Sequence, residues 1–486
     1  MTDAGPITRL KISEPLTHLP TSIFDHADSL EHLDLSGTGL SALPDDFSRL
    51  KKLKVAFFSD CHFSVFPSQL ASCPELEMVA FRGNNMSTVP EDSLPPRLRW
   101  LILTNNQIVA LPKSIGKCWR LQKCMLSGNR LTSLPEEMAS CKKLGLLRLS
   151  ANRFEQLPAW LFDLPELAFL SFAGNPCSTA TTPISECQAA SFGLVEASWS
   201  DLDVQETLGE GASGIISKGV WNNGADRSPH VAIKLFKGDV TSDGTPLDEM
   251  QACMTAGSHE NLIDPLGKIR DHPDCREGLV MQLVPPSYTT LGLPPSLQSC
   301  TRDCFPTSSS AGLTTTQGLR ILRGVASAAA HLHQRGVAHG DLYAHNILFN
   351  EEGHALLGDF GAASVYDHHH YGGQGQHSEN DGSNNSSSRL EQLEVLAFAH
   401  LIEDVWRLTP RPNFDEGELR VAMLLAGLHR RCASPLGSER PHFADIHRSL
   451  SELLLDLDPD RQVGCDGGSL ETTAVTMTAT TIKSAA

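Results

Sequence analysis

The stretch from His339 to Leu348, which reads His-Gly-Asp-Leu-Tyr-Ala-His-Asn-Ile-Leu, decides how the C-terminal part of this chain is interpreted. It contains Asp341 and, five residues later, Asn346; an Asp-Phe-Gly sequence follows, with Asp359 as its first residue. Phosphoryl transfer requires an aspartate that accepts a hydroxyl proton, and an amide and a second carboxylate that bind Mg²⁺. The stretch therefore indicates a phosphoryl-transfer site.

Features upstream of this stretch support the same interpretation. The glycines in Gly209–Gly214 predict a hairpin whose backbone can close over phosphate oxygens, because side chains are absent there. Val-Ala-Ile-Lys then predicts an apolar strand that ends in Lys234, and Glu249 opens a predicted helix from which it can pair with that lysine. In this order, the elements resemble the protein kinase family over roughly residues 198–456.

The resemblance implies a bilobal α+β protein kinase fold that uses ATP and Mg²⁺. Asp341 would be the catalytic base, Lys234 would bind phosphate while Glu249 holds it, and Asn346 and Asp359 would bind the metal. Met281 would be the gatekeeper at the start of the hinge between the lobes. The nucleotide-binding residues that the resemblance implies are Gly209, Gly211, Gly214, Ile216, Ala232, Lys234, Met281, Gln282 and Val284.

The chain also departs from the family pattern. Gly340 stands where most protein kinases have an arginine, so no cation is there to pair with a phosphorylated activation loop. Tyr343 stands where Ser/Thr kinases usually have a lysine, and His345 replaces the arginine typical of tyrosine kinases. The expected Ala-Pro-Glu after Asp-Phe-Gly is missing, and Glu394 stands for the aspartate that usually begins the next buried helix. We expect transfer to protein hydroxyls, with Ser/Thr favoured, although the loop leaves the acceptor type open.

Two other classes of protein stay open at this point. The departures are compatible with a catalytically weak pseudokinase that acts as a scaffold. His-Gly-Asp with an asparagine five residues later also resembles small-molecule kinases of the aminoglycoside and choline type. The glycine-rich loop, Val-Ala-Ile-Lys and Arg440-Pro441 favour a protein kinase, and every residue that would touch metal or phosphate is retained, which favours catalysis.

The first third of the chain has a clear period. Seven leucines start segments spaced by 22 or 23 residues, each close to Leu-x-x-Leu-x-Leu-x-x-Asn: Leu30, Leu53, Leu76, Leu98, Leu121, Leu144 and Leu167. This pattern resembles the leucine-rich repeat family and predicts an α/β solenoid. We expect the leucines to fill its interior and the asparagines to bond backbone groups of adjacent coils, with Thr38 and Cys61 replacing asparagine in the earliest repeats.

The residues between the strand leucines should point into the concave face of the solenoid. Read across the repeats, they form an apolar row of Val55, Phe57, Met78, Trp100, Ile102, Met125, Leu146 and Phe169. A row this apolar is a candidate surface for a protein substrate or regulator. The alternative is that flanking loops or the kinase domain itself cover it.

At 486 residues the chain is long enough for a multidomain protein. We expect a repeat solenoid at 1–177, a linker at 178–198, a kinase domain at 199–456 and a disordered tail at 457–486. Within the kinase domain we expect an insertion at 286–316 and a low-complexity activation segment at 367–388, which is too polar to bury a core.

Composition narrows the remaining classes. The net charge of −18 disfavours nucleic acid as a partner. No stretch is apolar enough to span a membrane and no secretory signal is visible, so we expect a soluble, cytoplasmic protein.

Overall fold

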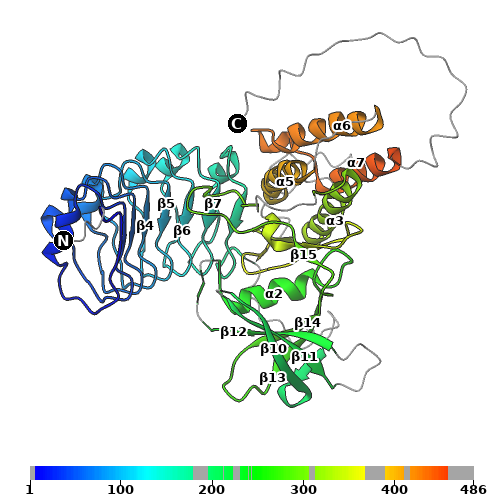
Figure 1. Ribbon diagram of the computed structural model, residues 1–486, viewed down its shortest axis with the longest axis horizontal. Coiled ribbons are helices and arrows are strands. Elements are labelled where there is room, and N and C mark those ends of the chain that lie inside the picture. The colour runs from blue at the N-terminus through cyan, green and yellow to red at the C-terminus, as the bar shows by residue number, and fades with distance from the viewer. Residues whose placement is uncertain are drawn as a thin grey trace, which may run out of the picture.

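The computed structural model describes residues 6–178, 195–211, 213–222, 230–238, 240–241, 243–305, 312–366, 389–409 and 416–457. These residues form a curved solenoid, followed by a domain of two lobes that meets the last coils of the solenoid (Figure 1). The predicted order, a repeat solenoid followed by a bilobal α+β fold, is confirmed.

One parallel sheet of eight short strands lines the concave side of the solenoid. Each strand pairs in register with the strand of the next coil; Leu101, for example, lies opposite Cys124. Because equivalent leucines recur once per coil, they stack along the interior, and Leu98, Leu101 and Leu103 are fully buried. The strands are β1 (Arg9–Lys11), β2 (His32–Asp34), β3 (Val55–Phe57), β4 (Met78–Ala80), β5 (Trp100–Ile102), β6 (Lys123–Met125), β7 (Leu146–Arg148) and β8 (Phe169–Ser171).

Short 3₁₀ helices form the opposite side of the coils. Each begins directly after a proline, which cannot donate a backbone hydrogen bond and whose fixed φ suits the entry to a helical turn, as at Pro112 before η4. These helices are η1 (Thr21–His26), η2 (Asp45–Arg49), η3 (Ser68–Ser72), η4 (Lys113–Lys117), η5 (Glu136–Ser140) and η6 (Ala159–Asp163).

A ladder of buried asparagines joins neighbouring coils, as predicted. The Asn152 amide donates to the carbonyl oxygens of Leu126 and Leu149, each at 2.9 Å, and its oxygen accepts from the N–H of Leu131 at 3.0 Å. In the early repeats Thr38 and Cys61 take over part of this role, because both donate to the carbonyl oxygen of Leu35. The ladder satisfies backbone groups that the narrow coil would otherwise leave unpaired.

The smaller lobe is built on a six-stranded sheet with the order β10-β11-β12-β14-β13-β9. Helix α2 (Pro246–Ala256) lies between this sheet and the larger lobe (Figure 1). It starts at a capping box, in which Thr245 and Asp248 each bond the other's backbone N–H, and at Pro246. The strands are β9 (Val195–Ser198), β10 (Leu202–Glu210), β11 (Gly214–Trp221), β12 (His230–Phe236), β13 (Pro265–Arg270) and β14 (Gly278–Gln282).

The larger lobe is mainly helical. Its helices are α3 (Thr315–Gln334), α5 (Arg389–Leu408), α6 (Glu416–Cys432) and α7 (Phe443–Asp456), with short 3₁₀ turns η8 (Trp199–Asp201), η9 (Ala344–Asn346) and η10 (Gly437–Glu439) elsewhere in the two-lobed domain. Two small sheets hold the loops that face the other lobe, and they consist of β15 (Thr289–Thr290), β17 (Ile347–Phe349) and β18 (Ala355–Leu357), and of β16 (Val337–Ala338) and β19 (Ser364–Val365).

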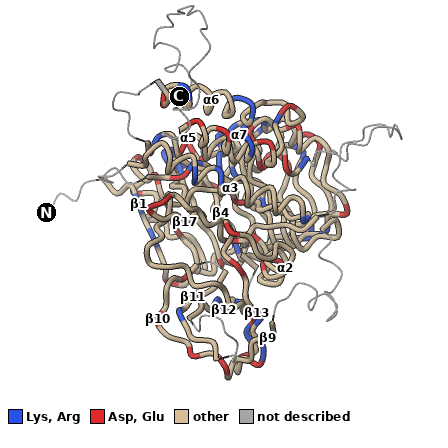
Figure 2. The backbone as a smooth tube through the Cα atoms, turned by 90° about the vertical axis from the view of Figure 1, so that its right-hand side faces the viewer, with Lys and Arg blue, Asp and Glu red and all other residues tan. Residues whose placement is uncertain are grey.

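Within the described residues, none of these helices combines the length and the apolar character that a bilayer crossing needs. Figure 2 shows acidic and basic positions interspersed along the backbone on the side that it presents. Over the whole sequence, 57 acidic residues outnumber 39 basic ones.

The solenoid and the two-lobed domain share their hydrophobic cores. Leu146 and Phe169, from β7 and β8, are buried within the core of the larger lobe. Conversely, Tyr366 and Leu390 of the larger lobe belong to the core of the solenoid. Because separating the two parts would expose both sets of side chains to water, apolar burial holds them together.

Several expected segments fall partly or wholly outside the described residues. The activation segment at 367–388 lies outside them, as do 179–194 of the expected linker, 306–311 of the expected insertion and 458–486 of the expected tail. The rest of the linker range contains β9, which pairs in parallel with β13 and so extends the sheet of the smaller lobe.

Candidate active site

The glycine-rich hairpin and Lys234 lie side by side in the smaller lobe. The register of the sheet pairs Ile216 with Gly209 on one side and with Lys234 on the other. A Cβ added to Gly209 or Gly211 would meet nothing within 4 Å, whereas a Cβ on Gly214 would lie 2.6 Å from the carbonyl oxygen of Leu235. Packing of the strand therefore requires glycine at 214, while the space at the two earlier glycines is open.

Lys234 and Glu249 form a buried ion pair between β12 and α2. The side chain of Lys234 is 9% exposed and that of Glu249 is 4% exposed. Burial alone lowers the pKa of Lys234, but the carboxylates of Glu249 and Asp359 raise it above its ordinary value. The lysine is therefore held as a cation between β12 and α2, within electrostatic reach of Asp359.

The catalytic loop places Asp341 and Asn346 together. The Asn346 amide donates to the backbone oxygen and to Oδ2 of Asp341, both at 2.9 Å. Because both bonds come from its NH₂ group, its carbonyl oxygen, the atom that a metal would bind, is not used by them. His339 anchors the loop through a 2.9 Å hydrogen bond between its Nε2 and the carbonyl oxygen of Gly358.

Asp359 is the second candidate metal ligand. Its side chain is exposed, and its backbone adopts φ 56°, a left-handed conformation that costs energy for a residue with a side chain. The N–H of Gly361 donates to its Oδ1 at 3.1 Å, which helps to hold this turn. The strained turn presents a carboxylate next to the Lys234–Glu249 pair, whose pKa values respond to its charge.

These residues fit a nucleotide with Mg²⁺. Within the described residues no cluster of three His, Cys, Asp or Glu side chains could hold a metal by itself. Mg²⁺ does not need such a cluster, because it usually binds one or two protein ligands together with phosphate oxygens and water. Asn346 and Asp359 match this requirement, and the open space above Gly209 and Gly211 is where phosphate oxygens could lie.

The predicted hinge follows β14. Met281 pairs with Ala232 of β12 and packs partly against the core of the larger lobe. The N–H of Gln282 donates to the carbonyl oxygen of Asp264 at 2.9 Å, so this donor is not free for a ligand. Val284 follows the strand and is half-buried.

Arg148 of the solenoid reaches the predicted catalytic loop, a contact that no sequence motif indicates. Its guanidinium donates to Oδ1 of Asp341 and to the carbonyl oxygen of Gly340, the latter at 2.8 Å, and its Nε lies 2.8 Å from Oδ1 of Asp243. Its side chain is only 2% exposed. The strand positions in register with Arg148 gave little signal: Met125 and Ile102 are apolar, but the same row also contains Lys11, Asp34 and Ser171.

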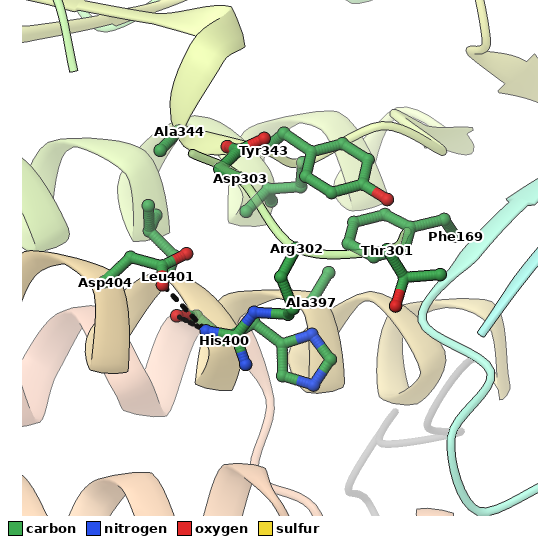
Figure 3. A pocket seen from close by; sticks show the side chains of 11 residues that line it. Phe169, Thr301, Arg302, Asp303, Tyr343, Ala344, Ala397, His400, Leu401 and Asp404 are labelled. Carbon is green, nitrogen blue, oxygen red and sulfur yellow. Dashed lines mark hydrogen bonds and ion pairs between the residues drawn. The ribbon is translucent and has the colours of Figure 1, made fainter. Parts of the chain in front are cut away.

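Phe169 covers the other side of the same loop. Its ring stacks on that of Tyr343 with centroids 3.8 Å apart and an interplanar angle of 9° (Figure 3). The cavity beside them, which Arg302, His400 and Asp404 also line, has a volume of about 10 Å³. This is room for about one water molecule, so the cavity is not a ligand site.

The apolar row on the concave face is therefore divided in two. Leu146 and Phe169 are buried in the core of the larger lobe, and Met125 packs against that core. For these three residues the structure agrees with the alternative that the kinase domain covers the row. Of the earlier members, Val55 and Met78 are buried as well, at 8% and 7% exposure, whereas Phe57, Trp100 and Ile102 are half-buried, and for these a partner surface stays a prediction.

Gly340 and Glu394 replace two charged residues that the family pattern led us to expect. The backbone N–H of Gly340 donates to Glu394, and Nε2 of His333 lies 2.7 Å from the other oxygen of that carboxylate. Burial raises the pKa of Glu394, but the hydrogen bond and charge of His333 outweigh it and lower that pKa below its ordinary value. Glu394 thus holds the start of the catalytic loop as a buried anion.

Comparison with known proteins agrees with this geometry. Residues 202–407 match the family model described as protein tyrosine and serine/threonine kinase, and residues 29–50 match the leucine-rich repeat model. The chain therefore combines leucine-rich repeats with a protein kinase domain.

The curated relatives are named as kinases, and this chain matches only part of the length of each. The probable serine/threonine-protein kinase gdt2 of Dictyostelium discoideum is 23% identical over 289 residues, which cover 54% of this chain and 16% of that protein. The probable L-type lectin-domain containing receptor kinase V.3 of Arabidopsis thaliana is 28% identical over 185 residues, or 37% of this chain and 26% of that protein. The chain thus spans about a quarter or less of the length of these relatives.

Proposed function

We propose that this chain is an active protein kinase that transfers the γ-phosphoryl group of ATP to serine or threonine hydroxyls of proteins. The observation that carries the proposal is the closed Lys234–Glu249 ion pair, because this pair must be in place before a kinase can position its nucleotide. Similarity to a protein named a probable serine/threonine-protein kinase supports the choice of acceptor.

In the proposed mechanism the acceptor hydroxyl lies beside Asp341. Its oxygen forms a bond to the γ-phosphorus as the bond from that phosphorus to the bridging oxygen of ADP breaks, and its proton passes to the Asp341 carboxylate. Lys234, held by Glu249, orients the phosphates beneath the glycine-rich hairpin. Asn346 and Asp359 would hold Mg²⁺, which, when bound, neutralises charge that develops on the β- and γ-phosphate oxygens.

Nucleotide binding would involve both lobes. We assign the phosphates to the glycine-rich hairpin and the adenine to the region between β12 and the hinge, with hinge backbone groups other than the N–H of Gln282 as hydrogen-bonding partners. The residues proposed for this role are Gly209, Gly211, Gly214, Ile216, Ala232, Lys234, Met281, Gln282 and Val284.

For the repeats we propose a role in binding a protein substrate or regulator. The proposed surface is the part of the concave row that the larger lobe does not cover and that stays partly exposed, namely Phe57, Trp100 and Ile102. Val55 and Met78 of the same row are buried and would support this surface from beneath. We further propose the domain limits 1–177 for the repeats and 199–456 for the kinase, with β9 (Val195–Ser198) added to the kinase because it pairs with β13. We also propose a cytoplasmic location. The described cysteines other than Cys177 have free thiols, among them Cys61, Cys118, Cys124 and Cys141 in the repeats, and this supports a reducing compartment.

The test is phosphate transfer by the purified chain. We expect radiolabel from γ-labelled ATP, with Mg²⁺, to appear on casein or histone and not on choline or an aminoglycoside. Asp341→Asn should abolish transfer while the thermal shift produced by Mg-ATP is retained, because Asp341 acts on the acceptor and not on the nucleotide. Asp274→Asn, an exposed aspartate of the smaller lobe, is the matched control.

Each alternative gives a different result. Transfer to the small aminoalcohols alone would identify a small-molecule kinase. Binding of Mg-ATP without transfer to any acceptor would identify a pseudokinase. Full activity of Asp341→Asn would refute the proposed role of this aspartate.

A further inference from the structure

We propose that Arg148 of the repeat solenoid is a positioning residue for the kinase reaction, because it supplies the catalytic aspartate with the cation that its own loop lacks. The inference rests on the proposed function. Between Gly340 and Asn346 the chain contains no lysine or arginine. The one imidazole at the end of this stretch, His345, is bound to Asp303, with Nδ1 2.7 Å from Oδ1.

The contacts of Arg148 orient the Asp341 carboxylate. Arg148 donates to one carboxylate oxygen and Asn346 to the other, so rotation of the carboxylate is restricted from both sides. A third contact, from Arg148 to the carbonyl oxygen of Gly340, ties the guanidinium to the backbone of the same loop. Two parallel donors of one planar guanidinium give a defined geometry that a lysine reproduces only in part.

Arg148 also brings an opposite charge to the aspartate. The guanidinium and the carboxylate form an ion pair whose side chains are 2% and 17% exposed. A cation held this close offsets part of the cost of burying the carboxylate. Asp243 shares the same guanidinium and so neutralises part of its charge.

The surrounding contacts show that this arrangement is built into the fold. The N–H of Phe172, next to β8, donates to Oγ of Ser364, and Oγ of Ser178 donates to the carbonyl oxygen of Val365, both at 2.9 Å. These bonds fix the residues that directly follow Asp-Phe-Gly. Together with the shared cores and the stack of Phe169 on Tyr343, these bonds hold the coil that carries Arg148 against the two-lobed domain.

The state of the smaller lobe argues for support of catalysis and against inhibition. With Arg148 at the catalytic loop, the Lys234–Glu249 pair is closed and Asp359 lies near enough to influence the pKa of Lys234. The docked solenoid therefore coexists with the arrangement that phosphoryl transfer needs. A domain that blocked the enzyme by distorting the cleft would break this pair.

The experiment compares Arg148→Met with Arg148→Lys and with Arg153→Met, which changes an exposed arginine of the same repeat. For label transfer from ATP to casein, we expect Arg148→Met to lower kcat at least about 10-fold, with KM for ATP changed less than about twofold. Arg148→Lys should restore part of the lost kcat, because it returns the charge but not the planar pair of donors. Arg153→Met should match the wild type.

Asp243→Ala tests the same idea without removing a buried cation, so it keeps the proposal testable if Arg148→Met does not fold. It removes the carboxylate that lies 2.8 Å from Nε of Arg148, so the guanidinium is held less firmly at Asp341 and kcat should fall at least about threefold, with KM for ATP changed less than about twofold. Unchanged or increased kcat in folded Arg148→Met, or in Asp243→Ala, would overturn the proposal. Transfer by Arg148→Met but not by the wild type would refute this inference and leave the proposed function standing. Absence of transfer by every variant and by the wild type would instead refute the proposed function.

Discussion

Replacing Gly340 by alanine tests how closely the solenoid approaches the catalytic loop. Gly340 has φ 73°, and a Cβ at this position would lie 2.5 Å from the carbonyl oxygen of Ala362 and 2.8 Å from that of Leu170. The first oxygen belongs to the segment after Asp-Phe-Gly and the second to strand β8 of the solenoid. Neither backbone group can move alone, so the collision must shift the interface itself.

Two terms contribute to the expected loss of stability. The left-handed backbone costs about 1 kcal/mol for alanine. Forcing a methyl group against two backbone oxygens costs about 1–3 kcal/mol, which gives a total of about 2–4 kcal/mol. At roughly 2–4 °C per kcal/mol, the apparent Tm should fall by roughly 4–16 °C.

The matched control is Gly37→Ala. Gly37 has φ 77°, nearly the same backbone conformation, but a Cβ there would meet nothing within 4 Å. This variant therefore carries the backbone cost without the collision, and differential scanning calorimetry of both variants isolates the contribution of the interface. If the two substitutions lower the Tm equally, the close approach of β8 to the catalytic loop is wrong.

Two further predictions concern the asparagine ladder and the catalytic loop. Asn152→Ala should destabilise the chain by about 2–4 kcal/mol in denaturant unfolding, because it leaves three buried backbone groups of two adjacent coils without this partner; the exposed Asn85→Ala should change stability by less than about 0.5 kcal/mol. Burial lowers the pKa of His345, but Asp303 outweighs this effect and raises that pKa above its ordinary value. The stability that the His345–Asp303 pair contributes is therefore complete below about pH 6.5, the pKa of an unfolded histidine, and is lost as the pH rises through the higher pKa of the folded state. Between pH 6 and 9, the Tm of His345→Asn should therefore decrease less with pH than the Tm of the wild type. The control His62→Asn, which changes an exposed histidine, should keep the wild-type slope. A slope for His345→Asn equal to that of the control would contradict this assignment.

The site could be predicted from the sequence only where its contacts lie within one structural unit. Lys234 and Glu249 are 15 residues apart, and Asp341 and Asn346 are five apart, so strand and loop spacing brings each pair together. Covering of the concave row by the larger lobe was anticipated only as an alternative. The strand β9 was missed because four residues with mixed polarity have no distinct period, and they become a strand only where β13 offers an edge.

The sequence by itself determined the repeats, the two lobes and the order of the phosphoryl-transfer residues, because each coil packs on the coil 22 or 23 residues away and each kinase motif is formed by neighbours in the chain. Only the tertiary structure decided that Arg148 meets Asp341, 193 residues later, and that Gly340 faces strand β8. No periodicity links a concave arginine to a catalytic loop. The contact arises from the docking of two surfaces, and docking depends on the shape, burial and charge that the folded units present to each other.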